Sequence, residues 1–185
     1  MIQGLCRWIL YKRCGFRFVE TVERPQKYII SLAPHTSNWD FVIGILFSRA
    51  EGFKCHFMMK QFWFFWPLGY LMKALGGVPV KRERHTSMTD AIAETARKSK
   101  EFHLCITPEG TRSRQPEWRR GFYYIALKAE LPILLYGLDY KRRLIQCTKQ
   151  VIPTGDYERE IVEIKQYYED FSGKYPEKFT TGLDN

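Results

Sequence analysis

The sequence lacks the features that mark several protein classes. None of its apolar runs reaches the roughly 18 residues of a membrane-spanning helix. The five cysteines are far apart and odd in number, and no pair has the spacing of metal ligands or of a small disulfide framework. Repeats, low-complexity tracts and Pro- or Ser-rich linkers are absent, and the apolar first ten residues lack the small-residue cleavage site of a secretory leader. We therefore expect one cytosolic domain with reduced thiols and no metal site.

The sequence has fewer acidic than basic residues. The 185 residues include 29 Lys and Arg against 20 Asp and Glu, a formal net charge of +9. Such a chain attracts an anionic partner, which leaves nucleic acid, a phosphorylated metabolite and an acidic lipid surface as candidates. A nucleic-acid-binding module would use the basic runs 81–84 and 141–143, but the sequence has neither an RNP-like block nor a KH loop. We therefore expect no nucleic-acid partner.

The N-terminal residues mix aromatic rings with cations. Residues 1–30 carry six positive and two negative side chains around Trp8, Phe16 and Phe18. This composition is typical of a helix that lies on anionic lipid, although an amphipathic helix packed on the domain is an equal alternative. We expect residues 1–24 to form an amphipathic membrane-surface segment, followed by a domain over residues 25–185.

A second uncharged aromatic stretch lies between Lys60 and Lys73. Five consecutive rings form its centre: Phe62, Trp63, Phe64, Phe65 and Trp66. Aromatic rings flanked by lysines are favoured at the lipid–water boundary, so we expect these residues to contact acyl chains or membrane. Burial in the core is the alternative.

Short apolar runs alternate with helical patterns along the chain. Strands are expected at residues 28–33, 55–59, 78–80, 102–107 and 133–138, and helices at 87–100, 118–130 and 156–171. This alternation predicts a single-domain α/β sandwich with a mixed, largely parallel sheet flanked by helices. In such sheets the functional loops follow the carboxyl ends of the strands.

The first of these loops contains a candidate catalytic pair, His35 and Asp40. A neutral imidazole can take a proton from a hydroxyl, and a carboxylate on its other nitrogen fixes the tautomer. Residues five apart on one helix point about 140° away from each other. The two side chains can therefore meet only if His35 lies in the turn and Asp40 in the first turn of the next helix.

Two further segments supply groups for binding an anion. The loop after the fourth expected strand contains Glu109, Gly110, Thr111 and Arg112, in which glycine allows a tight path and arginine offers a planar fork for phosphate. Residues 76–82 combine two glycines and a short strand with Lys81 and Arg82. The alternatives are a solvent-exposed turn for the Glu109 loop and, for residues 76–82, an edge strand that proline and charge protect from further pairing.

Together these segments resemble the glycerolipid acyltransferases, the family of the lysophosphatidic acid acyltransferases. The similarity covers about residues 25–140 and rests on four blocks: His35 to Asp40, Gly76 to Arg82, Pro108 to Ser113, and Pro132 to Tyr136. The Pro-Glu-Gly-Thr-Arg-Ser block matches the family pattern residue for residue.

The resemblance implies a 1-acylglycerol-3-phosphate O-acyltransferase with a glycerol-3-phosphate acyltransferase-like fold. Such an enzyme would move an acyl chain from acyl-CoA or acyl carrier protein to the free hydroxyl of a lysophospholipid, with no further cofactor. His35 would be the general base and Asp40 would orient it, while Glu109, Gly110, Thr111, Arg112 and Arg82 would bind the acceptor. The implied location is peripheral or monotopic, at the cytoplasmic face of a membrane.

Two other interpretations stay open at the level of sequence. In one, the same chemistry acts on another lysolipid, such as an amino-acid lipid, for which the cations Arg114, Arg119 and Arg120 are equally suited. A non-catalytic lipid-surface protein with this fold is the other, although the intact blocks at positions 35–40 and 109–112 argue against it.

Overall fold

The computed structural model describes residues 2–80 and 85–183. Seven strands form a single sheet in the order β1-β7-β6-β2-β5-β3-β4. Their bounds are β1 Arg17–Glu20, β2 Lys27–Ala33, β3 His56–Lys60, β4 Gly77–Val80, β5 Phe102–Ile106, β6 Ile133–Asp139 and β7 Leu144–Val151. Only the β6–β7 pairing is antiparallel among those described, so β1 and β7 run opposite to the other five strands.

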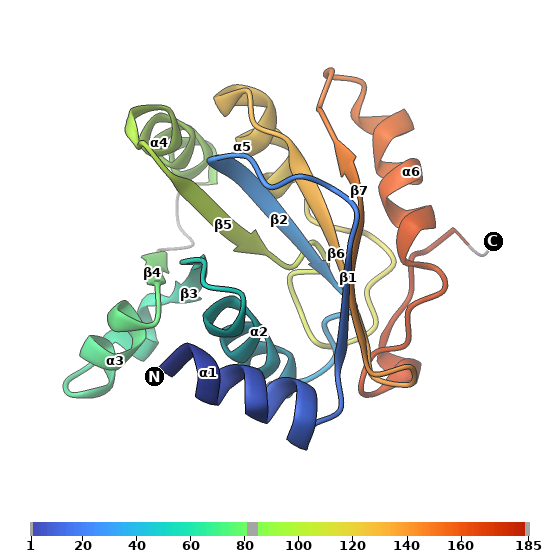
Figure 1. Ribbon diagram of the computed structural model, residues 1–185. Coiled ribbons are helices and arrows are strands. Elements are labelled where there is room, and N and C mark those ends of the chain that lie inside the picture. Colours follow the sequence, from blue (N-terminus) through green and yellow to red (C-terminus); the bar gives the residue numbers. More distant parts are fainter. Residues whose placement is uncertain (1, 81–84, 184–185) are drawn as a thin grey trace.

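Helices cover both faces of this sheet (Figure 1). One face carries α4 His85–Lys98, α5 Gly121–Ala129 and α6 Tyr157–Tyr168, and the other carries α1 Ile2–Arg7, η1 Trp8–Arg13 and α2 Trp39–Ala50. The short elements η2 Gln61–Phe64 and α3 Leu68–Ala74 lie between β3 and β4, and η3 Pro176–Lys178 lies near the C-terminus. The expected α/β sandwich with a mixed, largely parallel sheet is confirmed.

The central strands have helices on both sides, and their side chains divide between two cores. On β2, Ile29 and Ala33 pack into the core under α4, α5 and α6, whereas Tyr28 and Ile30 face α1 and α2. All seven residues of β6 are buried, as expected for the continuous apolar run of a strand covered on both faces.

The expected boundary between residues 24 and 25 does not coincide with a break in the structure. Strand β1 pairs with β7 over Arg17–Glu20 and so belongs to the same sheet as the rest of the chain. Leu10 and Phe16 are buried in the core beneath α2. The N-terminal helix is therefore packed on the domain through one face, and contact of its other face with a membrane stays a prediction.

Candidate active site

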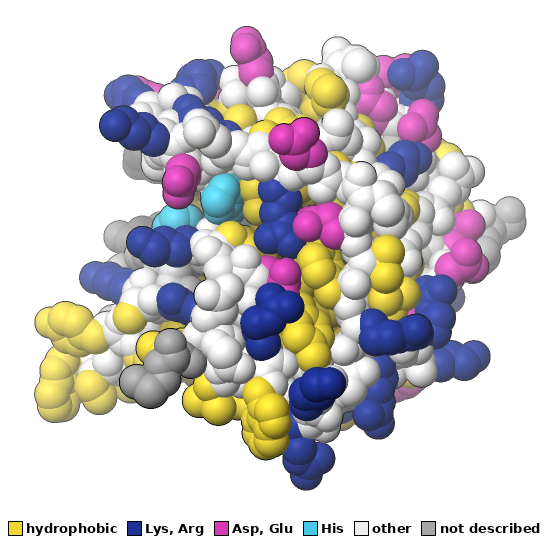
Figure 2. All heavy atoms as spheres, viewed as in Figure 1, with side chains coloured by type: hydrophobic (Ala, Val, Ile, Leu, Met, Phe, Trp, Pro, Cys, Tyr) yellow, Lys and Arg dark blue, Asp and Glu magenta, His cyan; other side chains and the backbone are white. Residues whose placement is uncertain are grey.

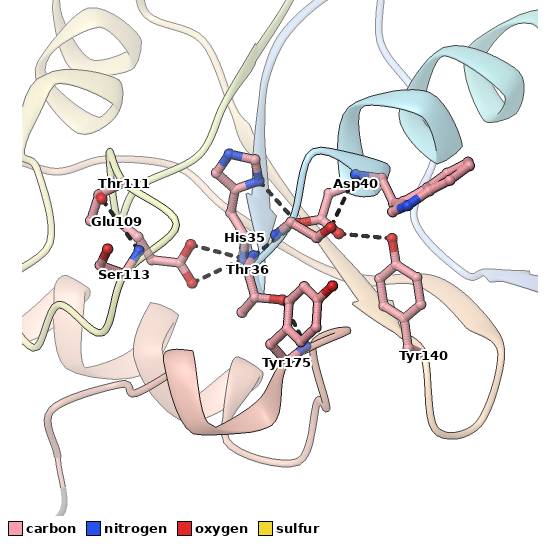
Figure 3. A network of polar contacts seen from close by, with 10 residues as sticks. His35, Thr36, Asp40, Glu109, Thr111, Ser113, Tyr140 and Tyr175 are labelled. Atoms are coloured by element: carbon pink, nitrogen blue, oxygen red, sulfur yellow. Dashed lines mark hydrogen bonds and ion pairs between the residues drawn. The ribbon is translucent and has the colours of Figure 1, made fainter.

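Three neighbouring strands bring the polar loops together. Strands β6, β2 and β5 are adjacent and parallel, so their carboxyl ends meet at one edge of the sheet. His35 follows β2, Glu109 follows β5, and Tyr140 follows β6. Figure 3 shows these side chains converging around the loop that leads into α2.

His35 and Asp40 are in direct contact. The Nδ1 atom of His35 lies 3.1 Å from Oδ2 of Asp40, which belongs to the first turn of α2. The geometry expected from the sequence, with histidine in the turn and aspartate at the helix start, is therefore present. Because the carboxylate accepts the proton on Nδ1, the lone pair is on Nε2, the atom that can receive a proton from substrate.

The Asp40 carboxylate is itself held in place by the backbone. The residue is only 1% exposed, and its Oδ2 atom also accepts hydrogen bonds from the backbone N–H groups of Thr36 and Ser37, both at 2.8 Å. Three groups of one loop therefore converge on a single oxygen of this buried carboxylate. These contacts tie Oδ2 to the loop that carries His35.

Glu109 contacts the same loop from the neighbouring strand. Its carboxylate oxygens lie 2.8 and 3.1 Å from the backbone nitrogen of His35, which donates to them, and the residue is 4% exposed. Burial raises the pKa of Glu109 to about 8, opposed by the His35 N–H and reinforced by the charge of Asp40. The carboxyl group that the sequence assigned to the acceptor therefore anchors the backbone of the loop that carries His35.

The rest of the Glu109 loop is open to solvent. Gly110 has φ +67°, and a Cβ there would lie 2.8 Å from Cγ of Arg119, so glycine is required. The hydroxyl of Thr111 accepts from the N–H of Ser113 at 3.3 Å. The exposed Arg112 forms no hydrogen bond or ion pair with residues 2–80 or 85–183, which leaves its guanidinium available. The other expected acceptor ligand, Arg82, lies outside the described residues.

Two contacts at this site were not expected from the sequence. The hydroxyl of Tyr140 donates to Oδ1 of Asp40 at 2.7 Å, and the N–H of Tyr175, in the C-terminal segment, donates to Oγ1 of Thr36 at 3.2 Å. The signal for Tyr140 was present, since it lies two residues after the expected strand 133–138 and strand ends gather at one edge. Nothing in the sequence indicated the second contact, which joins residues 139 positions apart.

The aromatic segment projects from the domain. Phe62, Trp63, Phe65 and Trp66 are 76%, 45%, 53% and 79% exposed, and only Phe64 is half-buried. Figure 2 shows apolar side chains gathered at the lower left, over η2 and α3. Burial in the core, the alternative left open by the sequence, therefore does not apply to four of the five rings.

The aromatic segment lies at the same edge of the sheet as the loops that carry His35 and Glu109. It follows the carboxyl end of β3, which is parallel to β5 and hence to β2. Among the described residues, no helix combines the length and apolar character needed to cross a bilayer, and no cluster of His, Cys, Asp and Glu is arranged to hold a metal ion.

Comparisons with known proteins agree with this architecture. The chain is similar to the crystal structure of the 1-acyl-sn-glycerophosphate (LPA) acyltransferase PlsC from Thermotoga maritima, with a TM-score of 0.58 and 17% identity over 93% of this chain and 80% of that chain. No curated protein sequence matches it. A sequence model of one family matches residues 15–136, which include β1, the whole loop from His35 to Asp40 and most of β6. On this match over more than half of its length, the chain belongs to the Acyltransferase family.

Proposed function

We propose that this acyltransferase moves a fatty acyl chain from an acyl thioester, acyl-CoA or acyl carrier protein, to the free hydroxyl of a lysophospholipid. Lysophosphatidic acid, which would give phosphatidic acid, is the first candidate acceptor. The observation that carries the proposal is the His35–Asp40 contact of 3.1 Å at the edge where Glu109 holds the same loop. The fold shared with an enzyme named for 1-acyl-sn-glycerophosphate supports the choice of acceptor.

The reaction needs one general base. Nε2 of His35 takes the proton of the acceptor hydroxyl as its oxygen attacks the carbonyl carbon of the thioester. Asp40 stabilises the imidazolium that forms. Collapse of the tetrahedral intermediate breaks the carbon–sulfur bond, and the departing thiolate takes the proton back from the imidazolium. The ester and the free thiol are the products, and neither a metal nor an additional cofactor takes part.

The acceptor's phosphate is assigned to the exposed part of the Glu109 loop. Arg112 has a free guanidinium fork for a bidentate contact, and Gly110 and Thr111 add a backbone N–H and a hydroxyl. Arg82 is proposed as a second cation for the same phosphate. Glu109 supports the reaction by holding the backbone of His35, because its carboxylate is buried against the N–H group of that residue.

The acyl chains reach the site from a membrane surface. The exposed rings at residues 62–66 follow the same sheet edge as His35, and α1 together with the first residue of η1 exposes a second apolar stripe of Ile2, Leu5 and Trp8. With a net charge of +9, these surfaces suit peripheral or monotopic binding to anionic lipid at the cytoplasmic face.

The direct test is mass spectrometry of lipids after incubation of the purified full chain with mixed acyl thioesters. Lysophosphatidic acid and a panel of other lysolipids, including amino-acid lysolipids, are offered as acceptors. We expect phosphatidic acid as the main product. His35→Ala should reduce its rate of formation at least ~10²-fold, the usual scale for loss of a general base, while the protein stays folded by circular dichroism.

Different outcomes would overturn different parts of the proposal. Preference for another lysolipid would replace the acceptor but keep the chemistry. Near-normal turnover by folded His35→Ala would exclude His35 as the base. Absence of any acylated product across all donors and acceptors would contradict the proposed activity itself.

A further inference from the structure

The two oxygens of the Asp40 carboxylate have different partners. Oδ2 accepts from the imidazole of His35 and from the N–H groups of Thr36 and Ser37. All three donors come from the loop that precedes α2. Oδ1 is held by one side chain from outside that loop, the hydroxyl of Tyr140, which follows β6, at 2.7 Å. Figure 3 shows this hydroxyl meeting the carboxylate on the side away from His35.

Tyr140 is itself rigidly placed. It follows the last residue of β6, and its N–H donates to the carbonyl oxygen of Ser172 at 2.9 Å. Its ring packs edge-on against Phe16, with the centroids 5.8 Å apart. The hydroxyl is therefore fixed by the sheet and the C-terminal segment, independently of the His35 loop.

The hydroxyl acts as a donor throughout the physiological pH range. Burial, followed by the charge of Asp40 and the hydrogen bond to it, raises the pKa of Tyr140 well above its usual value. A neutral phenol beside a buried carboxylate donates its proton in a charge-assisted hydrogen bond. Because both oxygens are then engaged, the carboxylate cannot rotate away from the imidazole.

We propose that Tyr140 is a positioning residue of the acyl-transfer reaction, whose hydroxyl locks the Asp40 carboxylate and thereby keeps His35 with its proton on Nδ1 and its lone pair on Nε2. The expected effect on the rate of acyl transfer rests on the proposed function. The expected effect on the His35 tautomer does not depend on any substrate. A general base is effective only in the correct tautomer and within hydrogen-bond reach of its proton, so loss of the lock lowers the rate of the chemical step and leaves substrate binding intact.

The test is Tyr140→Phe, which removes one oxygen and keeps the ring that packs on Phe16. We expect kcat to fall by about 10- to 100-fold, the scale found when the outer partner that orients a metal-bound histidine is removed. The KM values for donor and acceptor should stay within about twofold, because the residue touches neither. Nitrogen NMR of the His35 ring should show an Nδ1–H tautomer in the wild-type chain and a mixture of tautomers in the variant.

Tyr136→Phe is the matched control. Tyr136 lies on β6, the strand that precedes Tyr140, and is buried; its hydroxyl donates to the carboxylate of Glu20 at 3.0 Å and not to the His35–Asp40 pair. The Tyr136→Phe variant should lose about as much stability as Tyr140→Phe, without a change in kcat or in the His35 tautomer. A double-mutant cycle tests whether Tyr140 acts through Asp40. Tyr140→Phe should lower kcat much less in an Asp40→Asn background, since both changes disrupt the same carboxylate.

The outcomes separate this inference from the proposed function. Equal kcat values for Tyr140→Phe and Tyr136→Phe, or an unchanged His35 tautomer, would overturn the positioning role. A lower kcat together with higher KM values for both substrates and a lowered melting temperature would assign Tyr140 a structural role only. If the wild-type chain transfers no acyl group, the proposed function fails, and the tautomer measurement still decides whether Tyr140 orders the pair.

Discussion

Glu109 shows how the environment of a residue changes its role. Its carboxyl group is buried beside the negative charge of Asp40 and has one backbone donor, the N–H of His35. Burial and a like charge both disfavour the ionised form, which accounts for a pKa raised to about 8. The protonated and ionised forms can each accept the hydrogen bond from His35, but only the protonated form avoids a second charge in the site.

This raised pKa predicts that the free energy of unfolding depends on pH. The unfolded chain releases the Glu109 proton near the usual 4.5, whereas the folded chain releases it near 8. Stability from this group is therefore fully present below pH 4.5 and is lost as the pH rises toward 8, by an amount on the order of a few kcal/mol. Glu109→Gln should remove that slope, as measured by urea unfolding at a series of pH values.

An exposed carboxylate provides the comparison for this prediction. Glu177→Gln, in η3, should retain the wild-type slope because Glu177 is exposed to solvent. Steady-state kinetics add a second readout. The glutamine carbonyl can still accept from the N–H of His35, so Glu109→Gln keeps the contact with the His35 loop. A large rise in acceptor KM for Glu109→Gln would show that Glu109 binds the acceptor directly, and an unaltered pH slope would contradict its raised pKa.

At the scale of elements, periodicity located the strands that carry the site and missed two at one side of the sheet. The central strands 28–33 and 133–138 were predicted because they are continuous apolar runs, as covered strands are. Strand β1 has only four residues, with charge at both ends, and β7 mixes apolar residues with polar ones such as Gln146 and Lys149 without a regular alternation. Their pairing depends on contacts across more than 120 residues, which no local pattern encodes.

Helix starts and loop contacts show the same limit. Trp118 was expected to open a helix, but α5 begins at Gly121. The indole of Trp118 is buried in the preceding loop and donates to the carbonyl oxygen of Thr180. The His35–Asp40 pair was predictable because its two members are five residues apart and a turn can bring them together. The Tyr140 contact spans 100 residues and needed the sheet order.

The exposed aromatic segment predicts a separable membrane function. In the variant carrying Phe62→Ser and Trp66→Ser, two rings that are 76% and 79% exposed are lost. The melting temperature should therefore stay unchanged. Affinity for lipid vesicles should fall at least ~10-fold, because each buried ring contributes on the order of 1.5–3 kcal/mol of transfer free energy. Co-sedimentation with vesicles measures the loss.

Ile152 provides a matched apolar control for this segment. It is 68% exposed and follows β7, which runs opposite to β3, so it lies at the other edge of the sheet. Ile152→Ser should leave vesicle binding at the wild-type level. Equal losses for both variants, or none for the aromatic one, would exclude residues 62–66 as the part that enters the lipid.

At the scale of the whole molecule, charge and apolar surface make different contributions to binding. The net charge of +9 acts over the Debye length, which is about 10 Å at 0.1 M salt and about 3 Å at 1 M. Ring insertion, in contrast, depends on apolar area and is little affected by moderate salt. The proposed membrane contact therefore has one component that salt screens and one that it does not.

Vesicle composition and ionic strength separate these two components. Binding of the wild-type chain to vesicles rich in an anionic lipid should weaken steeply between 0.05 and 0.5 M salt, values chosen to shorten the Debye length roughly threefold. Binding to zwitterionic vesicles should be weaker at low salt and nearly independent of it. The variant lacking Phe62 and Trp66 should keep the salt-dependent part and lose the salt-independent part. If anionic and zwitterionic vesicles bind the chain equally at low salt, its positive charge serves a soluble partner, such as the phosphates of the acyl donor, and the membrane is reached through the aromatic rings alone.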